Sequence, residues 1–163
     1  MRHSTLEKEQ IYALLSSGIR RLLALGISGV GMSGLSALLA REGHLVVGYD
    51  RNPDAAISML AGRVDVRADA AEIRPRDYDL VYYSLAMDAR WERELSGYPS
   101  ASRAQVLGAV MMGYRHSIAI AGSHGKSTVT ALVDHILTAT GGAPTTLLGA
   151  TLSNGQTWRE GGA

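Results

Sequence analysis

The chain has 163 residues, which is enough for one solid domain and part of another. It is 46% hydrophobic and 19% charged, with a net charge of +1, as in ordinary globular proteins, and this balance argues against a nucleic-acid or anionic-membrane surface. The absence of cysteine excludes disulfides and thiolate metal sites, and the scattered histidines do not favour zinc. Because no run approaches ~20 apolar residues and no signal-peptide core opens the chain, we expect a cytoplasmic protein.

Apolar runs alternate with helical periodicities along the first two thirds of the chain. Buried strands are predicted at 21–26, 44–50, 63–66 and 78–84, with an edge strand at 99–102. Helices are predicted at 5–17, 32–43, 54–61, 88–96 and 103–114. This alternation is typical of a Rossmann-like α/β domain, a parallel sheet with helices on both faces, over residues 1–115.

The sequence pattern in the last third of the chain predicts one further β-α-β piece, with strands at 117–121 and 145–150 around a helix at 127–139. Residues 153–163 are polar and rich in glycine, and we interpret them as a loop. We place residues 116–163 after the domain boundary, as the truncated start of a second domain. A piece of this size rarely buries enough surface to be stable alone, so we expect it to pack on the first domain or on a neighbouring chain.

The first glycine cluster, "GISGVGMSG" (26–34), lies between a predicted strand and a predicted helix. Gly29, Gly31 and Gly34 form the pattern G-x-G-x-x-G, which allows a diphosphate to approach the backbone at a helix N-terminus. Asp50 follows the second strand, where a carboxylate can reach a ribose hydroxyl. By itself the pattern favours a dinucleotide such as NAD. The alternatives are a structural turn and, for Asp50, a polar residue before a helix.

The second glycine cluster, "AGSHGKS" (121–127), is not a standard Walker A loop, because Ile120 stands where that loop has its first glycine. The shorter spacing still allows a tight turn whose N–H groups face a phosphate. Lys126 is placed to contact phosphate oxygens, and the Ser127 hydroxyl to bind Mg²⁺. The alternative is a glycine-rich turn with a solvated lysine. We expect His124 to line the loop rather than to bind a metal.

Together, the two clusters resemble the Mur ligases, the ATP-dependent amide-forming enzymes of peptidoglycan synthesis. Their first loop typically reads G-I-G-G-I-G-M-S-G, and their phosphate loop reads A-G-T-H-G-K-T-[ST]. Further similar stretches are "REGHLVVGYD", "YYSLAM", "RAQVLGAVM" and "APTTLLGA". The resemblance covers about residues 20 to 150. It is strongest to the member of the family that joins L-alanine to UDP-N-acetylmuramate.

The resemblance implies that the first domain holds a UDP-sugar instead of NAD. Diphosphate contacts are then expected from Gly29, Gly31, Met32 and Ser33. The nucleotide side is expected to meet Asp50, Ser84 and Ala86. The resemblance also implies that residues 116–163 are the truncated start of a central P-loop, ATP-binding domain. Its loop is expected to hold ATP, and the loop residues are Gly122, Ser123, His124, Gly125, Lys126, Ser127 and Thr128. Lys126 is the expected catalytic group, which stabilises the transferring phosphoryl group, and Ser127 is the expected Mg²⁺ ligand.

The chain also departs from the family pattern. Ser28 replaces a usual Gly and Tyr49 a usual Ser, Ser123 and Ser127 replace Thr, and Ala143 stands where Asp is frequent. The family's ligases carry a full central domain and a third domain, so we expect this piece to be inactive alone. The alternatives are a ligase that recycles a tripeptide onto the same UDP-sugar, a non-catalytic nucleotide-binding module, and an NAD-binding domain.

Overall fold

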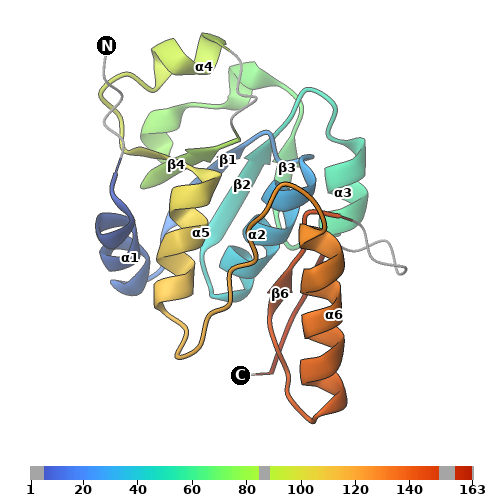
Figure 1. Cartoon of the computed structure of the whole chain (residues 1–163). Helices are drawn as coiled ribbons and strands as arrows, with labels where there is room; N and C mark the ends of the chain where they lie inside the picture. The colour runs from blue at the N-terminus through green and yellow to red at the C-terminus, as the bar shows by residue number, and fades with distance from the viewer. Residues whose placement is uncertain (1–5, 85–88, 151–156, 163) are drawn as a thin grey trace.

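The computed structural model describes residues 6–84, 89–150 and 157–162. Its centre is a five-stranded parallel sheet in the order β3-β2-β1-β4-β5 (Figure 1). The strands are β1 (Arg21–Leu25), β2 (Leu45–Tyr49), β3 (Asp65–Arg67), β4 (Leu80–Tyr83) and β5 (Ser100–Ser102). The order reverses between β1 and β4, and this switch point is where α/β sheets bind ligands. The predicted Rossmann-like α/β class is therefore confirmed.

The helices surround this sheet, and two 3₁₀ turns (Ala70–Glu72 and Pro75–Asp77) lead from β3 to β4. They are α1 (Lys8–Ser16), α2 (Val30–Arg41), α3 (Asp54–Leu60), α4 (Ala89–Glu94), α5 (Arg103–Met112) and α6 (Lys126–Ala139). The start of α5 is fixed by a capping box, in which the Ser102 hydroxyl accepts the Gln105 N–H and the Gln105 side chain accepts the Ser102 N–H. The helix therefore begins directly where β5 ends.

Both faces of the sheet are buried, as the continuous apolar runs predict. Leu22 and Ala24 of β1 face one core, which α1, α2, α3 and α5 cover. Leu23 and Leu25 face a second core, which α4 covers with Trp91. Successive side chains of a strand point to opposite faces, so β1 anchors both layers and holds the loop that follows it.

The last third of the chain differs from the prediction. Residues 117–121 do not form a strand, and Ile118 is 65% exposed. A strand needs a partner for its backbone N–H and C=O groups, and no described strand pairs with this segment. The predicted strand 145–150 is reduced to β6 (Thr146–Leu147), which pairs antiparallel with β7 (Trp158–Arg159). The expected β-α-β piece is therefore not formed, and the expected terminal loop contains a strand.

The β6–β7 ribbon packs on α2, and Trp158, only 3% exposed, belongs to the same core as the main sheet. A Cβ atom on Gly34 would lie 3.3 Å from Leu147 Cδ2 and 3.4 Å from Trp158 Cβ. Gly34, the last glycine of the G-x-G-x-x-G pattern, thus makes room for the ribbon. The expected packing of the last third on the first domain is present here, whereas the domain boundary itself stays a prediction.

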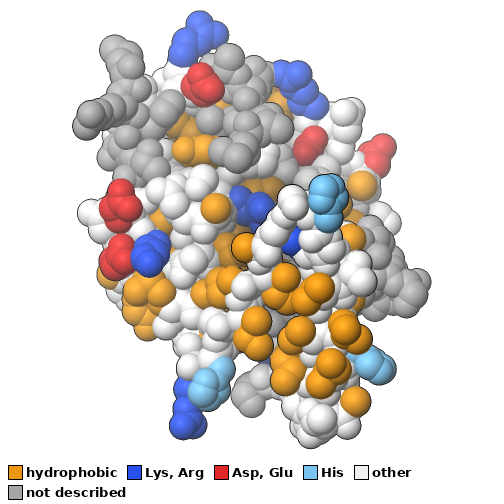
Figure 2. All heavy atoms as spheres, viewed as in Figure 1, with side chains coloured by type: hydrophobic (Ala, Val, Ile, Leu, Met, Phe, Trp, Pro, Cys, Tyr) orange, Lys and Arg blue, Asp and Glu red, His pale blue; other side chains and the backbone are white. Residues whose placement is uncertain are grey.

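Helix α6 has no buried residue and is held at one side by the ribbon. Its Asp134 carboxylate accepts hydrogen bonds from Thr146 Oγ1 at 2.7 Å and from Arg159 Nη1 at 3.0 Å. Apolar side chains gather over the helix in Figure 2. The large exposed ones on α6 are Val129, Leu132, Ile136 and Leu137. His135 is exposed on the same helix, on the surface as the sequence suggests.

Candidate nucleotide-binding site

The first glycine loop joins β1 to α2 at the switch point of the sheet, and its backbone is held by hydrogen bonds. The N–H groups of Gly26 and Ile27 both donate to the Tyr49 carbonyl, at 2.8 and 3.1 Å. The Ser28 N–H donates to Asp50 Oδ2 at 3.0 Å, and the Gly29 N–H to the Gly26 carbonyl at 3.1 Å. Hydrogen bonds within the protein therefore hold the backbone of the first glycine loop in its conformation.

The Asp50 carboxylate ties the loop to the end of β2. Its Oδ2 accepts the Ser28 N–H, and its Oδ1 accepts the Asn52 N–H at 3.1 Å. The Ser28 hydroxyl donates to the Asn52 carbonyl at 2.8 Å and closes the same turn. This tether is a structural role that the sequence did not reveal. It leaves a contact between Asp50 and a ribose as a prediction.

The start of α2 supplies the free donors of the loop. Val30 and Gly31 are the first two residues of the helix, so their N–H groups have no acceptor within it. Met32 and Ser33 follow, with side chains 1% and 0% exposed. Met32 belongs to the core, and Ser33 Oγ donates to the Val30 carbonyl at 3.1 Å. Both side chains therefore face the protein interior, and the expected diphosphate contacts of these two residues stay a prediction.

Ser84, at the carboxyl end of β4, lies where the sequence suggests, beside the loop. A Cβ atom on Gly26 would be 3.0 Å from Ser84 Oγ, and the Ser84 N–H donates to the Leu25 carbonyl at 3.4 Å. Ala86, the other residue expected on the nucleotide side, lies outside the described residues.

One residue of this site was missed by the sequence reasoning. A Cβ atom on Gly31 would lie 2.8 Å from Arg103 Nη1 and 3.1 Å from Arg103 Cζ, so the Arg103 guanidinium lies against the start of α2. Arg103 is the first residue of α5, immediately after β5. Two signals were available. Arg103 opens "RAQVLGAVM", one of the stretches similar to the Mur ligases, and it follows a predicted strand, where the carboxyl ends of parallel strands meet at one edge of the sheet.

The second loop is exposed, and its lysine folds back onto it. Lys126 Nζ donates to the Gly122 carbonyl at 2.6 Å and to the Ser123 carbonyl at 3.1 Å. Gly125 precedes α6 with φ 77°, a left-handed conformation that favours glycine. The predicted residues His124 and Thr128 are exposed and Ser127 is half-buried. The loop thus places the N–H groups of a 14-residue helix and a lysine beside one another, which suits a phosphate.

The second loop offers an isolated oxygen ligand for a metal ion and not a cluster of ligands. Within residues 6–84, 89–150 and 157–162, no group of three His, Asp or Glu side chains is placed to hold a metal. Ser127 Oγ remains one candidate ligand, and it lies 3.6 Å from the position of a Cβ on Gly149. Mg²⁺ keeps several waters and uses substrate phosphates, so a single hydroxyl fits part of such a site.

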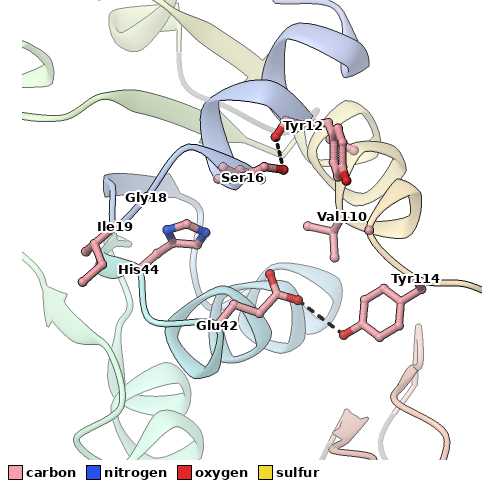
Figure 3. A pocket seen from close by; sticks show the side chains of 11 residues that line it. Tyr12, Ser16, Gly18, Ile19, Glu42, His44, Val110 and Tyr114 are labelled. Carbon is pink, nitrogen blue, oxygen red and sulfur yellow. Dashed lines mark hydrogen bonds between the residues drawn. The ribbon is translucent and has the colours of Figure 1, made fainter. Parts of the chain in front are cut away.

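A separate cavity of about 470 Å³ opens near the amino ends of β1 and β2, away from both loops (Figure 3). Tyr12 and Tyr114 border it, and the Tyr114 hydroxyl donates to Glu42 Oε1 at 3.3 Å. Burial raises the pKa of Glu42 and lowers the pKa of His44, which Arg20 lowers further. His44 Nδ1 accepts a hydrogen bond from the backbone N–H of Arg20 at 3.3 Å.

No family model matches the chain. It is 37% identical over 147 residues to the UDP-N-acetylmuramate–L-alanine ligase of Lachnospira eligens, and the matched region covers 85% of this chain and 32% of the relative. It is 38% identical over 140 residues to the enzyme of the same name from Aromatoleum aromaticum, with 83% and 30% covered. The chain therefore spans about a third of the length of the curated relatives it matches.

Solved structures share the fold. The UDP-N-acetylmuramate–alanine ligase of Thermotoga maritima superposes with a TM-score of 0.70 at 24% identity, over 87% of this chain and 35% of that one. The UDP-N-acetylmuramate:L-alanyl-gamma-D-glutamyl-meso-diaminopimelate ligase of Neisseria meningitides gives 0.72 at 27% identity, over 88% and 47%. The chain shares its fold with solved Mur ligases, and the resemblance found in the sequence is confirmed. Curated homologues of this chain at 35–37% identity are, specifically, named UDP-N-acetylmuramate–L-alanine ligase.

No described helix is both long and apolar enough to cross a membrane.

Proposed function

We propose that this chain is the UDP-sugar-binding part, together with the phosphate loop, of an ATP-dependent ligase that joins L-alanine to UDP-N-acetylmuramate in peptidoglycan synthesis. The observation that carries the proposal is the pair of glycine loops, each at a helix N-terminus, in a chain whose curated relatives bear that enzyme's name. Each loop by itself fits many nucleotide-binding proteins. The pair, in this order, fits a protein that holds two phosphorylated substrates.

The first loop is proposed to hold the diphosphate of the UDP-sugar. The free N–H groups of Val30 and Gly31 lie at the positive end of the α2 dipole, where a diphosphate is stabilised. Asp50 and Ser84 flank the loop from β2 and β4, and we propose that they line the nucleotide side. The Asp50 carboxylate holds the loop in position and keeps unused lone pairs for a ribose hydroxyl.

The second loop is proposed to hold ATP with Mg²⁺. Its residues fit the phosphates, because the lysine, the free N–H groups at the start of α6 and the Ser127 hydroxyl belong to one short turn. When bound, ATP supplies the phosphoryl group that activates the muramoyl carboxylate as an acyl phosphate, which the amino group of L-alanine attacks. Lys126 must leave the carbonyls of Gly122 and Ser123 to contact that group and stabilise its charge.

We propose that these 163 residues do not turn over ATP by themselves. An in-line phosphoryl transfer needs metal ligands and a positioned acceptor, and the described residues provide no cluster of acids for the metal. A P-loop helix with its apolar face exposed is also an incomplete domain. The relatives are about three times longer than the matched region, which agrees with a need for further chain.

Isothermal titration calorimetry tests the proposal. We expect the chain to bind UDP-N-acetylmuramate more tightly than NADH and to hydrolyse no ATP, and we expect Lys126→Ala to leave UDP-sugar binding unchanged. Absence of UDP-N-acetylmuramate binding, or preferential binding of NADH, would overturn it. A non-catalytic nucleotide-binding module would be indicated if a longer chain containing these residues also failed to form the amide.

A second candidate is a ligase that attaches a tripeptide to the same UDP-sugar. It is favoured by the solved structures, since the Neisseria meningitides protein that shares the fold is named for that reaction. The site described here binds the part of the substrate that both reactions share. An amide-forming assay of a longer chain, with L-alanine in one arm and the tripeptide in the other, separates the two.

A further inference from the structure

The anion-binding capacity of the first loop depends on very few backbone donors. The N–H groups of Gly26, Ile27, Ser28 and Gly29 are all engaged within the protein. Those of Met32 and Ser33 both donate to the Gly29 carbonyl, at 2.8 and 3.0 Å. Only Val30 and Gly31 remain, at the first two positions of α2. Two neutral donors are few for a diphosphate, which carries about two negative charges in a UDP-sugar.

The charge that these donors lack is supplied from the other side of the switch point. Arg103 begins α5 at the carboxyl end of β5, and α2 begins beyond the carboxyl end of β1. The Arg103 guanidinium lies over Gly31. Its Nη1, Cζ and Nε atoms are 2.8, 3.1 and 3.4 Å from the position that a Cβ atom on Gly31 would occupy. The planar group therefore lies against Gly31, the residue that carries one of the two free N–H groups.

The helix dipoles do not favour this arrangement. A cation at a helix N-terminus is opposed by the helix dipole, and Arg103 lies at the N-termini of both α2 and α5. Neither helix has an acidic residue in its first turn, and no ion pair with Arg103 occurs in the described part of the chain. An anion bound between the two helix ends would turn this repulsion into attraction.

We propose that Arg103 is a diphosphate-binding residue of the UDP-sugar site, and that Gly31 lacks a side chain chiefly to let the guanidinium reach the diphosphate. The inference rests on the proposed function and adds to it a residue from a helix distant in sequence. The planar fork of arginine donates to two oxygens at once, which matches a phosphate group better than a lysine does. A methyl group at position 31 would displace the fork.

The test measures binding of UDP-N-acetylmuramate by calorimetry at two salt concentrations. We expect Arg103→Ala to weaken binding about 10- to 100-fold, as for loss of hydrogen bonds to a charged group, and to reduce its dependence on salt. Arg103→Lys retains part of the affinity. Gly31→Ala weakens binding to a similar extent, and the double variant is little worse than either single one, because both changes remove the same contact. Arg76→Ala, an exposed arginine at the opposite edge of the sheet, serves as the control.

Thermal unfolding distinguishes a ligand-binding role from a structural one. Arg103→Ala should unfold at the same temperature as the wild type or slightly higher, because it removes a cation from two positive helix ends. If the wild-type chain binds UDP-N-acetylmuramate and Arg103→Ala binds it with the same affinity and the same salt dependence, this inference is overturned and the proposed function stays intact. A wild-type chain that binds no UDP-sugar would overturn both.

Discussion

The hydroxyl groups of Ser36 and Tyr82 form a 2.6 Å hydrogen bond between α2 and β4, and both side chains are fully buried. Burial raises the pKa of Tyr82, so the phenol stays neutral and each hydroxyl is satisfied by the other. The bond fixes the rotation of α2 over the sheet. It thereby helps to set the direction in which the first turn of α2, with its free N–H groups, faces the proposed UDP-sugar site.

Removing one partner of this pair should cost more than removing both. We expect Tyr82→Phe and Ser36→Ala each to lower the free energy of unfolding by about 1–3 kcal/mol, because each leaves a buried hydroxyl unsatisfied. The double variant should lose less than the sum of the two. Urea denaturation of the four proteins measures the coupling. Strict additivity would show that the two hydroxyls act independently.

Trp158 holds the last third of the chain on α2. Trp158→Ala removes a side chain that is 3% exposed and should cost about 3–5 kcal/mol. Because Trp158 belongs to a two-stranded ribbon, we expect the ribbon and α6 to detach before the main sheet unfolds. Limited proteolysis should then cleave within 113–163 first. Trp91→Ala, the matched change in the other core, should not produce that order of cleavage.

The Asp50 carboxylate should hold the conformation of the whole first glycine loop. Asp50→Ala leaves the N–H groups of Ser28 and Asn52 without their acceptor, and we expect a loss of about 1–2 kcal/mol in stability and weaker UDP-sugar binding. Titration with UDP and 2′-deoxy-UDP tests how it acts. If Asp50 only tethers the loop, both affinities fall by the same factor. A larger loss for UDP would demonstrate the predicted contact with the ribose.

His44 should make the fold sensitive to mild acid. Burial, and to a smaller extent the charge of Arg20, lower the pKa of His44 in the folded protein below its ordinary value of 6.5, so the unfolded chain takes up the proton first as the pH falls. This contribution to stability is complete above about pH 6.5 and is lost as the pH falls through the folded pKa. Glu42, whose pKa is raised, acts in the opposite direction, since its protonation on acidification favours the folded state.

We therefore expect His44→Gln to flatten the fall in unfolding free energy between pH 7 and pH 5. Denaturant titrations at these two pH values, repeated on a Glu42→Gln background, separate the two groups. His116→Gln, a change at an exposed histidine, is the control. An unchanged slope in His44→Gln would show that other groups cause the acid sensitivity.

Most of the parallel sheet could be predicted from the sequence, because each of its central strands is a short apolar run buried on both faces. Such runs are visible locally, as in "RLLALG" and "HLVVGYD". The same logic failed for "SIAIA" (117–121), which has the composition of a strand. A strand exists only where another strand accepts its hydrogen bonds, and none of the described strands does so.

Only part of the candidate site could be predicted from the sequence, because a local pattern does not show which distant residues meet. The glycine pattern located the loop and the start of α2, since a local turn requires small residues in sequence order. It could not show that Met32 and Ser33 face the core, because one turn of a helix carries both inward and outward positions. Nor could it show that Gly34 makes room for the ribbon, since Leu147 and Trp158 are more than 100 residues away.

The sequence by itself determined the α/β class, the two loops and the resemblance to the Mur ligases, because these depend on short-range patterns of polarity and glycine. Only the tertiary structure decided which groups meet at the switch point. Parallel strands bring their carboxyl ends to one edge whatever their order in the chain, and that order placed β5 near β1. Through this arrangement Arg103 lies against Gly31, and a residue distant in sequence from the first glycine loop enters the proposed UDP-sugar site.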